Sequence, residues 1–183
     1  MKPGDPAAVE QLFDSVASRY DQLNDLLSLG LHRQWKRQLQ CFLKPAAGET
    51  WLDLCCGTGD LALELARRVR PGGSVVGLDA AAAPLELARQ RQRRQPWLNV
   101  LFQQGDALAT GLPDASADGI VMAYGLRNLK DPAAGLVEMA RLLKPGRRAG
   151  VLDFNRLTTS GPAANFQRFY PVSYTHLTLP TKA

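Results

Sequence analysis

Apolar residues recur along this chain at two spacings, one typical of helices and one typical of buried strands. The helical spacing predicts an amphipathic segment at 9–20 and helices at about 31–43, 59–69, 84–94 and 132–143. Short apolar runs predict strands at 50–55, 74–79, 99–103, 118–124 and 149–154. Proline and glycine mark several helix ends, as in Lys144-Pro145-Gly146. This alternation predicts an α/β fold with a parallel sheet and helices on both of its faces.

The segment before the first predicted strand favours a helical N-terminal arm. Its apolar positions between residues 9 and 20 fall on one helix face, which includes Tyr20. We find no repeat, linker or second domain, and 183 residues suffice for one domain with a sizeable core. No apolar run approaches the roughly 20 residues of a membrane span, and the N-terminus lacks a signal-peptide pattern. We therefore expect a cytoplasmic protein, and peripheral contact with a membrane is compatible with that expectation.

The cysteine and charge content excludes some function classes. Cys41, Cys55 and Cys56 are the three cysteines, and the last two are adjacent in a predicted strand, so their side chains should point to opposite faces. This pattern matches neither a metal site nor a disulfide framework, and we predict no metal. The net charge of +5 is compatible with nucleic acid or an anionic surface but requires neither.

A glycine turn between the first predicted strand and its helix is typical of a nucleoside-cofactor site. Gly57, Thr58 and Gly59 follow the strand, and Asp79 ends the next apolar run. Glycines allow the backbone to approach a ligand, and the later carboxylate suits ribose hydroxyls. The structural alternative is a tight strand–helix turn without a ligand.

Two carboxylates beside this turn indicate which cofactor it binds. Asp60 replaces the third glycine of the dinucleotide pattern, and Asp53 lies just before the turn. A dinucleotide places its pyrophosphate at the helix N-terminus, where no anion is wanted. Carboxylates there suit the ammonium and sulfonium of S-adenosylmethionine instead. We therefore predict S-adenosylmethionine as the cofactor, with Asp53 as a cap of the following helix as the alternative.

The last residues break the pattern of the chain. The segment Val172–Leu179 alternates like a terminal strand, but its first six residues also resemble the translated end of a transposon adapter used in sequencing libraries. We therefore expect one domain at 1–171, incomplete at its C-terminal end, and a non-native tail at 172–183.

Several separated motifs resemble the quinone C-methyltransferases of ubiquinone and menaquinone synthesis. The first is the segment from Tyr20 to Trp35, in which Leu23 replaces the usual Met. Tyr124–Asn128 and Arg141–Gly146 match two further family segments. The resemblance covers residues 5–171. Its ending, Asp153-Phe154-Asn155, is most similar to members from photosynthetic lineages, which methylate a phytylated naphthoquinol.

The resemblance implies a Rossmann-like class I methyltransferase fold, of which five of the usual seven strands are present. It implies S-adenosylmethionine-dependent C-methylation of a prenylated or phytylated naphthoquinol in menaquinone or phylloquinone biosynthesis. The expected partner is a lipophilic quinol, and a homodimer is compatible with the sequence. A chain without the last strands would expose the predicted strand 149–154 as an edge, and we expect poor solubility or no activity.

The resemblance also extends the list of site residues. Asp106 matches the family's adenine contact, with Ala107 beside it, and Tyr124 lies in a matching segment after the fourth predicted strand. Arg127 is the candidate cation that stabilises an ionised ring hydroxyl, and His32 is the candidate base. Tyr20 completes the catalytic candidates.

Each of these residues has a structural alternative. Asp106 could form a turn beside Gly105, Tyr20 and His32 could be packed in the core, and Arg127 could form a structural salt bridge.

Three other functions fit the sequence less well. A benzoquinol of ubiquinone biosynthesis could replace the naphthoquinol, and a truncated chain could bind S-adenosylmethionine without turnover. An RNA methyltransferase of the same fold is favoured by the positive charge alone. The chain lacks a stripe of aromatic and basic residues, so we expect no nucleic-acid partner.

Overall fold

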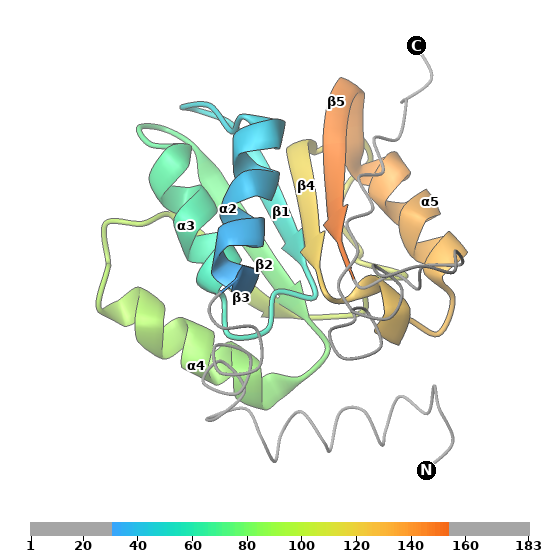
Figure 1. Cartoon of the computed structure of the whole chain (residues 1–183), viewed down its shortest axis with the longest axis horizontal. Coiled ribbons are helices and arrows are strands. Elements are labelled where there is room, and N and C mark those ends of the chain that lie inside the picture. The colour runs from blue at the N-terminus through green and yellow to red at the C-terminus, as the bar shows by residue number, and fades with distance from the viewer. Residues whose placement is uncertain (1–30, 154–183) are drawn as a thin grey trace, which may run out of the picture.

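Five parallel strands form the centre of the protein (Figure 1). The computed structural model describes residues 31–153. The strands are β1 (Thr50–Leu54), β2 (Ser74–Asp79), β3 (Val100–Gln104), β4 (Ala117–Ala123) and β5 (Leu143–Leu152). Their order across the sheet is β3-β2-β1-β4-β5, and every neighbouring pair is parallel. The predicted α/β fold with a parallel sheet is confirmed.

Helices cover both faces of this sheet (Figure 1). They are α2 (Leu31–Leu43), α3 (Asp60–Arg68), α4 (Ala82–Arg93) and α5 (Pro132–Leu142), with a short 3-10 helix η1 (Leu126–Asn128). Side chains of α2, α3 and α4 share one apolar cluster, and those of α5 belong to a second. The predicted amphipathic segment 9–20 and the predicted tail 172–183 lie outside the described residues.

Strand β1 contributes to both apolar clusters because successive side chains point to opposite faces. Trp51 belongs to the cluster under α2, α3 and α4, whereas Leu52 and Leu54 belong to the cluster under α5. Asp53 has the parity of Trp51 and therefore points toward the side of α2 and α3.

Several predicted boundaries differ from the structure by one or two residues, and three boundaries differ for an identifiable local reason. Strand β5 begins at Leu143 rather than 149, because Leu143 already pairs with Ala117 before a register irregularity. The predicted helix stop Lys144-Pro145-Gly146 therefore lies inside the strand, at that irregularity, where proline is tolerated. Helix α4 begins at Ala82 rather than 84, because proline is compatible with the first turn of a helix. Strand β1 ends at Leu54, and Cys55 has a left-handed φ of 56°.

The strand order reverses at β1, which lies between β2 and β4. In open α/β sheets, ligands bind in the crevice at the carboxyl ends of the strands at this switch point. The glycine turn leaves β1 at this point and Tyr124 follows β4, so the fold brings two separate candidate segments to the same end of the sheet.

Candidate functional site

A carboxylate at the end of β2 holds the glycine turn after β1. Oδ2 of Asp79 accepts a hydrogen bond of 2.7 Å from the backbone N–H of Gly57, and Oδ1 accepts one of 3.0 Å from Ala81. Burial raises the pKa of Asp79, although these backbone N–H groups oppose the rise. A carboxylate has about four acceptor positions, so two bonds leave capacity for ligand hydroxyls.

Gly57 and Gly59, the two glycines of the turn, have different structural roles. Gly59 has a φ of 76°, and a Cβ there would lie 2.6 Å from the Phe102 ring, so this glycine allows close packing of α3. Gly57 has a φ of 53°, and a Cβ there would meet nothing within 4 Å. The open side of the turn is therefore at Gly57, where a ligand can approach the backbone.

Thr58, between these glycines, is buried against α4. Its backbone oxygen and its Oγ1 both accept hydrogen bonds from Arg91, at 3.2 and 3.0 Å. Any cofactor contact by this residue would therefore come mainly from its backbone N–H.

Three charged side chains meet under the turn. Asp53 is 1% exposed and its Oδ2 has no hydrogen-bond partner, whereas Asp60 is paired with Lys36 at 2.8 Å. Burial raises the pKa of Asp53 well above its usual value, Asp60 adds to the rise, and Lys36 opposes it. Burial opposes ionisation of Asp60, but Lys36, Arg91 and the backbone N–H of Leu61 together lower its pKa. This cluster suits a cationic ligand, which would stabilise the ionised form of Asp53.

Asp53 also faces the first turn of α3, because the backbone N–H of Ala62 acts on it and lowers its pKa. Asp53 can therefore cap α3 and also contact a cofactor, since a carboxylate can accept several hydrogen bonds.

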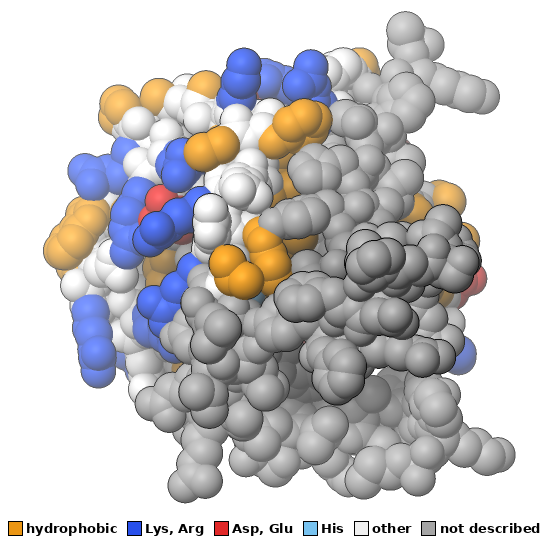
Figure 2. Space-filling view, viewed as in Figure 1, with side chains coloured by type: hydrophobic (Ala, Val, Ile, Leu, Met, Phe, Trp, Pro, Cys, Tyr) orange, Lys and Arg blue, Asp and Glu red, His pale blue; other side chains and the backbone are white. Residues whose placement is uncertain are grey.

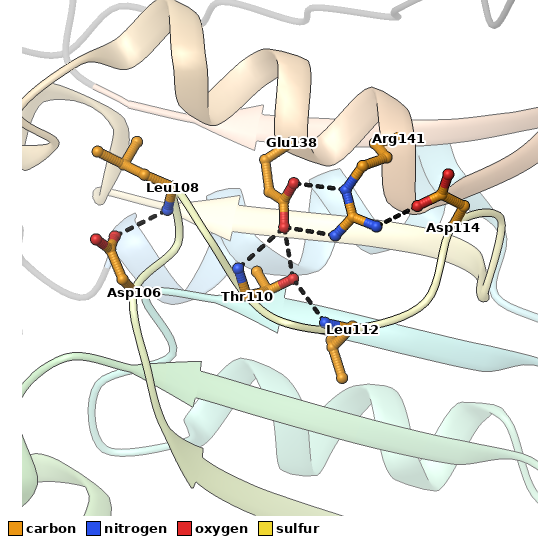
Figure 3. Close-up of polar contacts among 7 residues, drawn as sticks. All are labelled: Asp106, Leu108, Thr110, Leu112, Asp114, Glu138 and Arg141. Atoms are coloured by element: carbon orange, nitrogen blue, oxygen red, sulfur yellow. Dashed lines mark hydrogen bonds and ion pairs between the residues drawn. The ribbon is translucent and has the colours of Figure 1, made fainter.

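Asp106 belongs to a loop that is anchored to α5 (Figure 3). Its Oδ1 accepts a hydrogen bond of 2.8 Å from the N–H of Leu108, so the turn-forming alternative is realised. Further along the loop, the N–H and Oγ1 of Thr110 donate to Oε1 of Glu138, at 2.9 and 2.6 Å. Ala107 is buried in the apolar cluster under α5.

Glu138 is in turn held by Arg141, which also pairs with Asp114 (Figure 3). The hydrogen bonds from Arg141 lower the pKa of Glu138 to about 2, so this carboxylate is ionised at neutral pH. A buried, charged bond therefore fixes the loop that carries Asp106.

The Tyr124 ring lies near two cations from separate elements. Nζ of Lys36 is 5.9 Å and Cζ of Arg127 is 6.0 Å from its ring centroid. Tyr124 has a left-handed φ of 62°, and its backbone N–H donates to the oxygen of Leu152 over 2.6 Å. A non-glycine residue in this region is strained, and such strain is concentrated at functional sites.

Arg127 forms an ion pair with Asp153 at the end of β5. Its backbone N–H also donates to Oδ2 of Asp153 over 3.0 Å. The structural salt bridge considered as an alternative is therefore present. It also holds the guanidinium in place after β4, beside Tyr124.

Two catalytic candidates remain, Tyr20 and His32. Tyr20 lies outside the described residues. His32 is 7% exposed and lines a cleft between α2 and α3. Its role as a base stays a prediction.

The sequence analysis missed Lys36, Glu138 and the pairing of Asp153 with Arg127. Lys36 and Asp60 are 24 residues apart, and Thr110 and Glu138 are 28 apart. No local spacing signals such contacts. The one available signal was the position of Asp153 at the end of a predicted strand.

Other chemistries find little support at this site. Burial raises the pKa of Cys55 and of Cys56, so both are neutral thiols rather than nucleophiles. Within residues 31–153, no group of three or more His, Cys, Asp or Glu side chains is arranged to hold a metal ion. In the same range, no helix combines the length and apolar character that crossing a bilayer requires.

A sequence profile of the ubiE/COQ5 methyltransferase family matches residues 1–178, which include part of the predicted tail. The chain is 51% identical over 162 residues to the 2-phytyl-1,4-naphtoquinone methyltransferase of Thermosynechococcus vestitus, covering 88% of this chain and 71% of that protein. It is 43% identical over 152 residues to the chloroplastic 2-phytyl-1,4-beta-naphthoquinone methyltransferase of Arabidopsis thaliana, covering 81% of this chain and 58% of that protein.

Solved structures with the same fold include a SAM-dependent methyltransferase from Aquifex aeolicus. The TM-score is 0.62 at 23% identity, and the match covers 88% of this chain and 79% of that one. The fold is therefore the Rossmann-like fold of class I methyltransferases.

Proposed function

The chain belongs to the ubiE/COQ5 methyltransferase family, and on this premise we propose that it methylates a ring carbon of a phytylated or prenylated naphthoquinol, with S-adenosylmethionine as donor. The observation that carries the substrate class is the match at 51% identity to a 2-phytyl-1,4-naphtoquinone methyltransferase. The product would be a precursor in phylloquinone or menaquinone biosynthesis.

The residues at the carboxyl ends of β1 and β2 fit the cofactor. Gly57 leaves open space beside its backbone, and Asp79 retains acceptor positions for ribose hydroxyls. The unpartnered Oδ2 of Asp53 provides a negative group near the turn for a cationic cofactor. We assign Gly57, Thr58, Gly59, Asp53 and Asp79 to cofactor binding. Asp106, Ala107 and Tyr124 complete the proposed site.

Arg127 supplies the charge that the acceptor ring requires. When bound, S-adenosylmethionine supplies an activated methyl group. The acceptor carbon becomes strongly nucleophilic only when a neighbouring ring hydroxyl is ionised. A phenol has a pKa near 10, so about one molecule in a thousand is ionised at pH 7. Lowering that pKa to 7 takes about 4 kcal/mol, which a guanidinium beside the oxygen can supply in part.

Asp153 holds Arg127 through both its side chain and its backbone N–H. A guanidinium fixed in this way needs little reorganisation as negative charge develops on the substrate oxygen. His32 remains the proposed proton acceptor, and Tyr20 remains a proposed catalytic residue. Exclusion of water and positioning of the substrate lower the rest of the barrier.

The direct test uses the enzyme with its natural C-terminal sequence in place of the proposed tail, incubated with methyl-labelled S-adenosylmethionine and a demethylnaphthoquinol under reducing conditions. Label transfer to the naphthoquinol ring, with little transfer to a matching benzoquinol, is the expected result. Cofactor binding without transfer to either quinol would contradict the proposed activity of this chain. A preference for the benzoquinol would contradict the proposed substrate.

We propose residues 1–171 as a single methyltransferase domain and 172–183 as a non-native tail. Sequencing the source DNA across the codon of Pro171 tests this boundary. Because the proposed quinol is lipophilic, we also propose peripheral membrane contact, to be tested by flotation with vesicles. A homodimer would be detected by light scattering.

A further inference from the structure

A basic cleft of about 480 Å³ opens between α2 and α3. Its lining comes from these two helices, and Arg91 of α4 completes it. Asp60 and Lys36 of the charged cluster under the turn lie in this lining, whereas Asp53, Gly57, Asp79 and Arg127 are absent from it. The cleft is therefore distinct from the turn that we assign to the cofactor.

The sequence places basic side chains along one stripe of α2. Lys36 and Arg37 lie three and four residues after Arg33, and Gln40 follows them by four and three, so all four share a helix face. The facing stripe of α3 carries Asp60, Leu61, Glu64 and Arg67. Figure 2 shows Lys and Arg side chains gathered around acidic ones on this face of the molecule.

The cleft carries an excess of positive charge. Its lining holds five Lys and Arg side chains and two carboxylates, which is a formal excess of three positive charges. Asp60 is already paired with Lys36, at 2.8 Å, and Glu64 with Arg67, also at 2.8 Å. Arg68, which does not line the cleft, adds a second partner to Glu64 at 3.4 Å. Arg91 also lowers the pKa of Asp60, so the formal excess belongs to the lining as a whole rather than to any one side chain.

Gln40 provides an independent sign of a ligand. Its side chain is 1% exposed and lies in the cleft lining, yet neither Nε2 nor Oε1 has a hydrogen-bond partner. Buried amides are almost always hydrogen-bonded, because an unpaired one is costly. An anion in the cleft would accept a hydrogen bond from Nε2 and remove that cost.

We propose that this cleft binds a phosphate group. Guanidinium groups match phosphate oxygens with two parallel hydrogen bonds, and several of them here surround one space. The volume of about 480 Å³ leaves room for an organic part beside the phosphate group. Either a soluble phosphate ester or the headgroup of an anionic lipid has this chemistry, and the experiment below separates them.

The test measures two interactions of the purified full chain. Calorimetric titration with inorganic phosphate and glycerol phosphate measures the soluble ligands. Sedimentation with phosphatidylcholine vesicles, with and without phosphatidylglycerol, measures the lipid. Binding in either arm supports the site, and tighter binding in one arm identifies the source. Absence of binding in both arms overturns the proposal.

Variants then assign the binding to the cleft. Arg33→Gln with Arg37→Gln should weaken binding by roughly tenfold or more, because two charge-assisted contacts are lost. Arg148→Gln is the control, because Arg148 is an exposed arginine of β5 outside the cleft. Equal weakening by the control would show non-specific charge attraction and overturn the site.

Gln40→Met separates a ligand role from a structural one. It removes an amide that has no partner, so thermal stability of the unliganded chain should stay the same or rise, while phosphate binding weakens. A clear loss of stability with unchanged phosphate affinity would show that Gln40 is structural. Affinity for S-adenosylmethionine, measured in parallel, should not change in these variants, so this test is independent of the proposed methylation.

Discussion

The backbone N–H of Gly57 donates a hydrogen bond of 2.7 Å to Oδ2 of Asp79. The carboxylate at the end of β2 therefore holds the turn that follows β1. The part of the proposed cofactor site on β1 and the part on β2 depend on one another. Asp79→Ala should therefore disturb the turn as well as remove a ligand group. Affinity for S-adenosylmethionine should fall by roughly tenfold to a hundredfold, as expected for loss of charged hydrogen bonds. Asp79→Asn keeps one acceptor oxygen, so its affinity for S-adenosylmethionine should lie between those of the parent and of Asp79→Ala. Unchanged affinity in Asp79→Ala by calorimetry would remove this residue from the site.

Alanine at the two glycines of the turn should have different consequences. Gly57→Ala meets no atom, so its stability cost is the left-handed backbone strain of roughly 1–2 kcal/mol, but cofactor affinity should fall. Gly59→Ala adds a clash with Phe102, so the loss of stability should be larger. Gly48→Ala is the matched control, with a φ of 83° and open space away from the turn. Chemical denaturation and calorimetry on the three variants give both quantities. A cofactor defect in Gly48→Ala equal to that of Gly57→Ala would mean that strain alone is responsible.

Asp53→Asn should stabilise the unliganded fold at neutral pH and weaken the binding of the cofactor. Burial raises the pKa of Asp53, so the folded state binds its proton more tightly than the unfolded state does. The contribution of this group is therefore fully present below the unfolded pKa of about 3.8 and is lost as the pH rises through the folded pKa. The variant should be more stable than the parent at pH 7, by about 1–3 kcal/mol, and equal to it near pH 3. Urea titrations across this range measure the difference. A variant that is less stable at pH 7 would show that the ionised carboxylate is satisfied by the protein.

Glu138→Gln should loosen the loop that carries Asp106. The pKa of Glu138 is lowered to about 2 by Arg141, so its stabilising effect is present above about pH 4.5 and is lost as the pH falls toward 2. The substitution should lower the free energy of unfolding by roughly 1–3 kcal/mol at pH 7, because the buried hydrogen bond from Thr110 loses its charged acceptor. Binding of S-adenosylmethionine should weaken several-fold. Glu86→Gln removes an exposed ion pair with Arg93 and should change stability far less, because solvent screens that pair. Equal effects of the two substitutions would contradict a special role for Glu138.

Removing the guanidinium of Arg127 should slow catalysis without affecting the cofactor. In Arg127→Gln, kcat should fall by roughly a hundredfold to a thousandfold, and the dissociation constant of S-adenosylmethionine should stay within about twofold. Asp153→Asn should produce a smaller fall, because the guanidinium remains but loses its partner. If the ion pair is merely structural, both variants will melt at lower temperature with kcat unchanged.

Much of the fold could be predicted from local patterns. The helix over 31–43 and the strand over 74–79 agree with the structure at both ends, since apolar periodicity and glycine or proline stops define these elements locally. The early start of β5 could not be predicted, because Leu143 becomes a strand residue only by pairing with Ala117. Strand pairing across a sheet is a property of two distant segments, and the local signal at Lys144-Pro145-Gly146 points to a turn.

The candidate site also has parts that the sequence predicts and parts that only the tertiary structure reveals. The sequence by itself determined the fold class, the glycine turn and the carboxylates after successive strands, because each is a short motif with a recognisable spacing. Tertiary structure alone decided that Lys36 neutralises Asp60, that Asp153 holds Arg127 and that Glu138 anchors the loop of Asp106. These contacts join segments more than twenty residues apart, and their strength depends on burial, which local sequence does not specify.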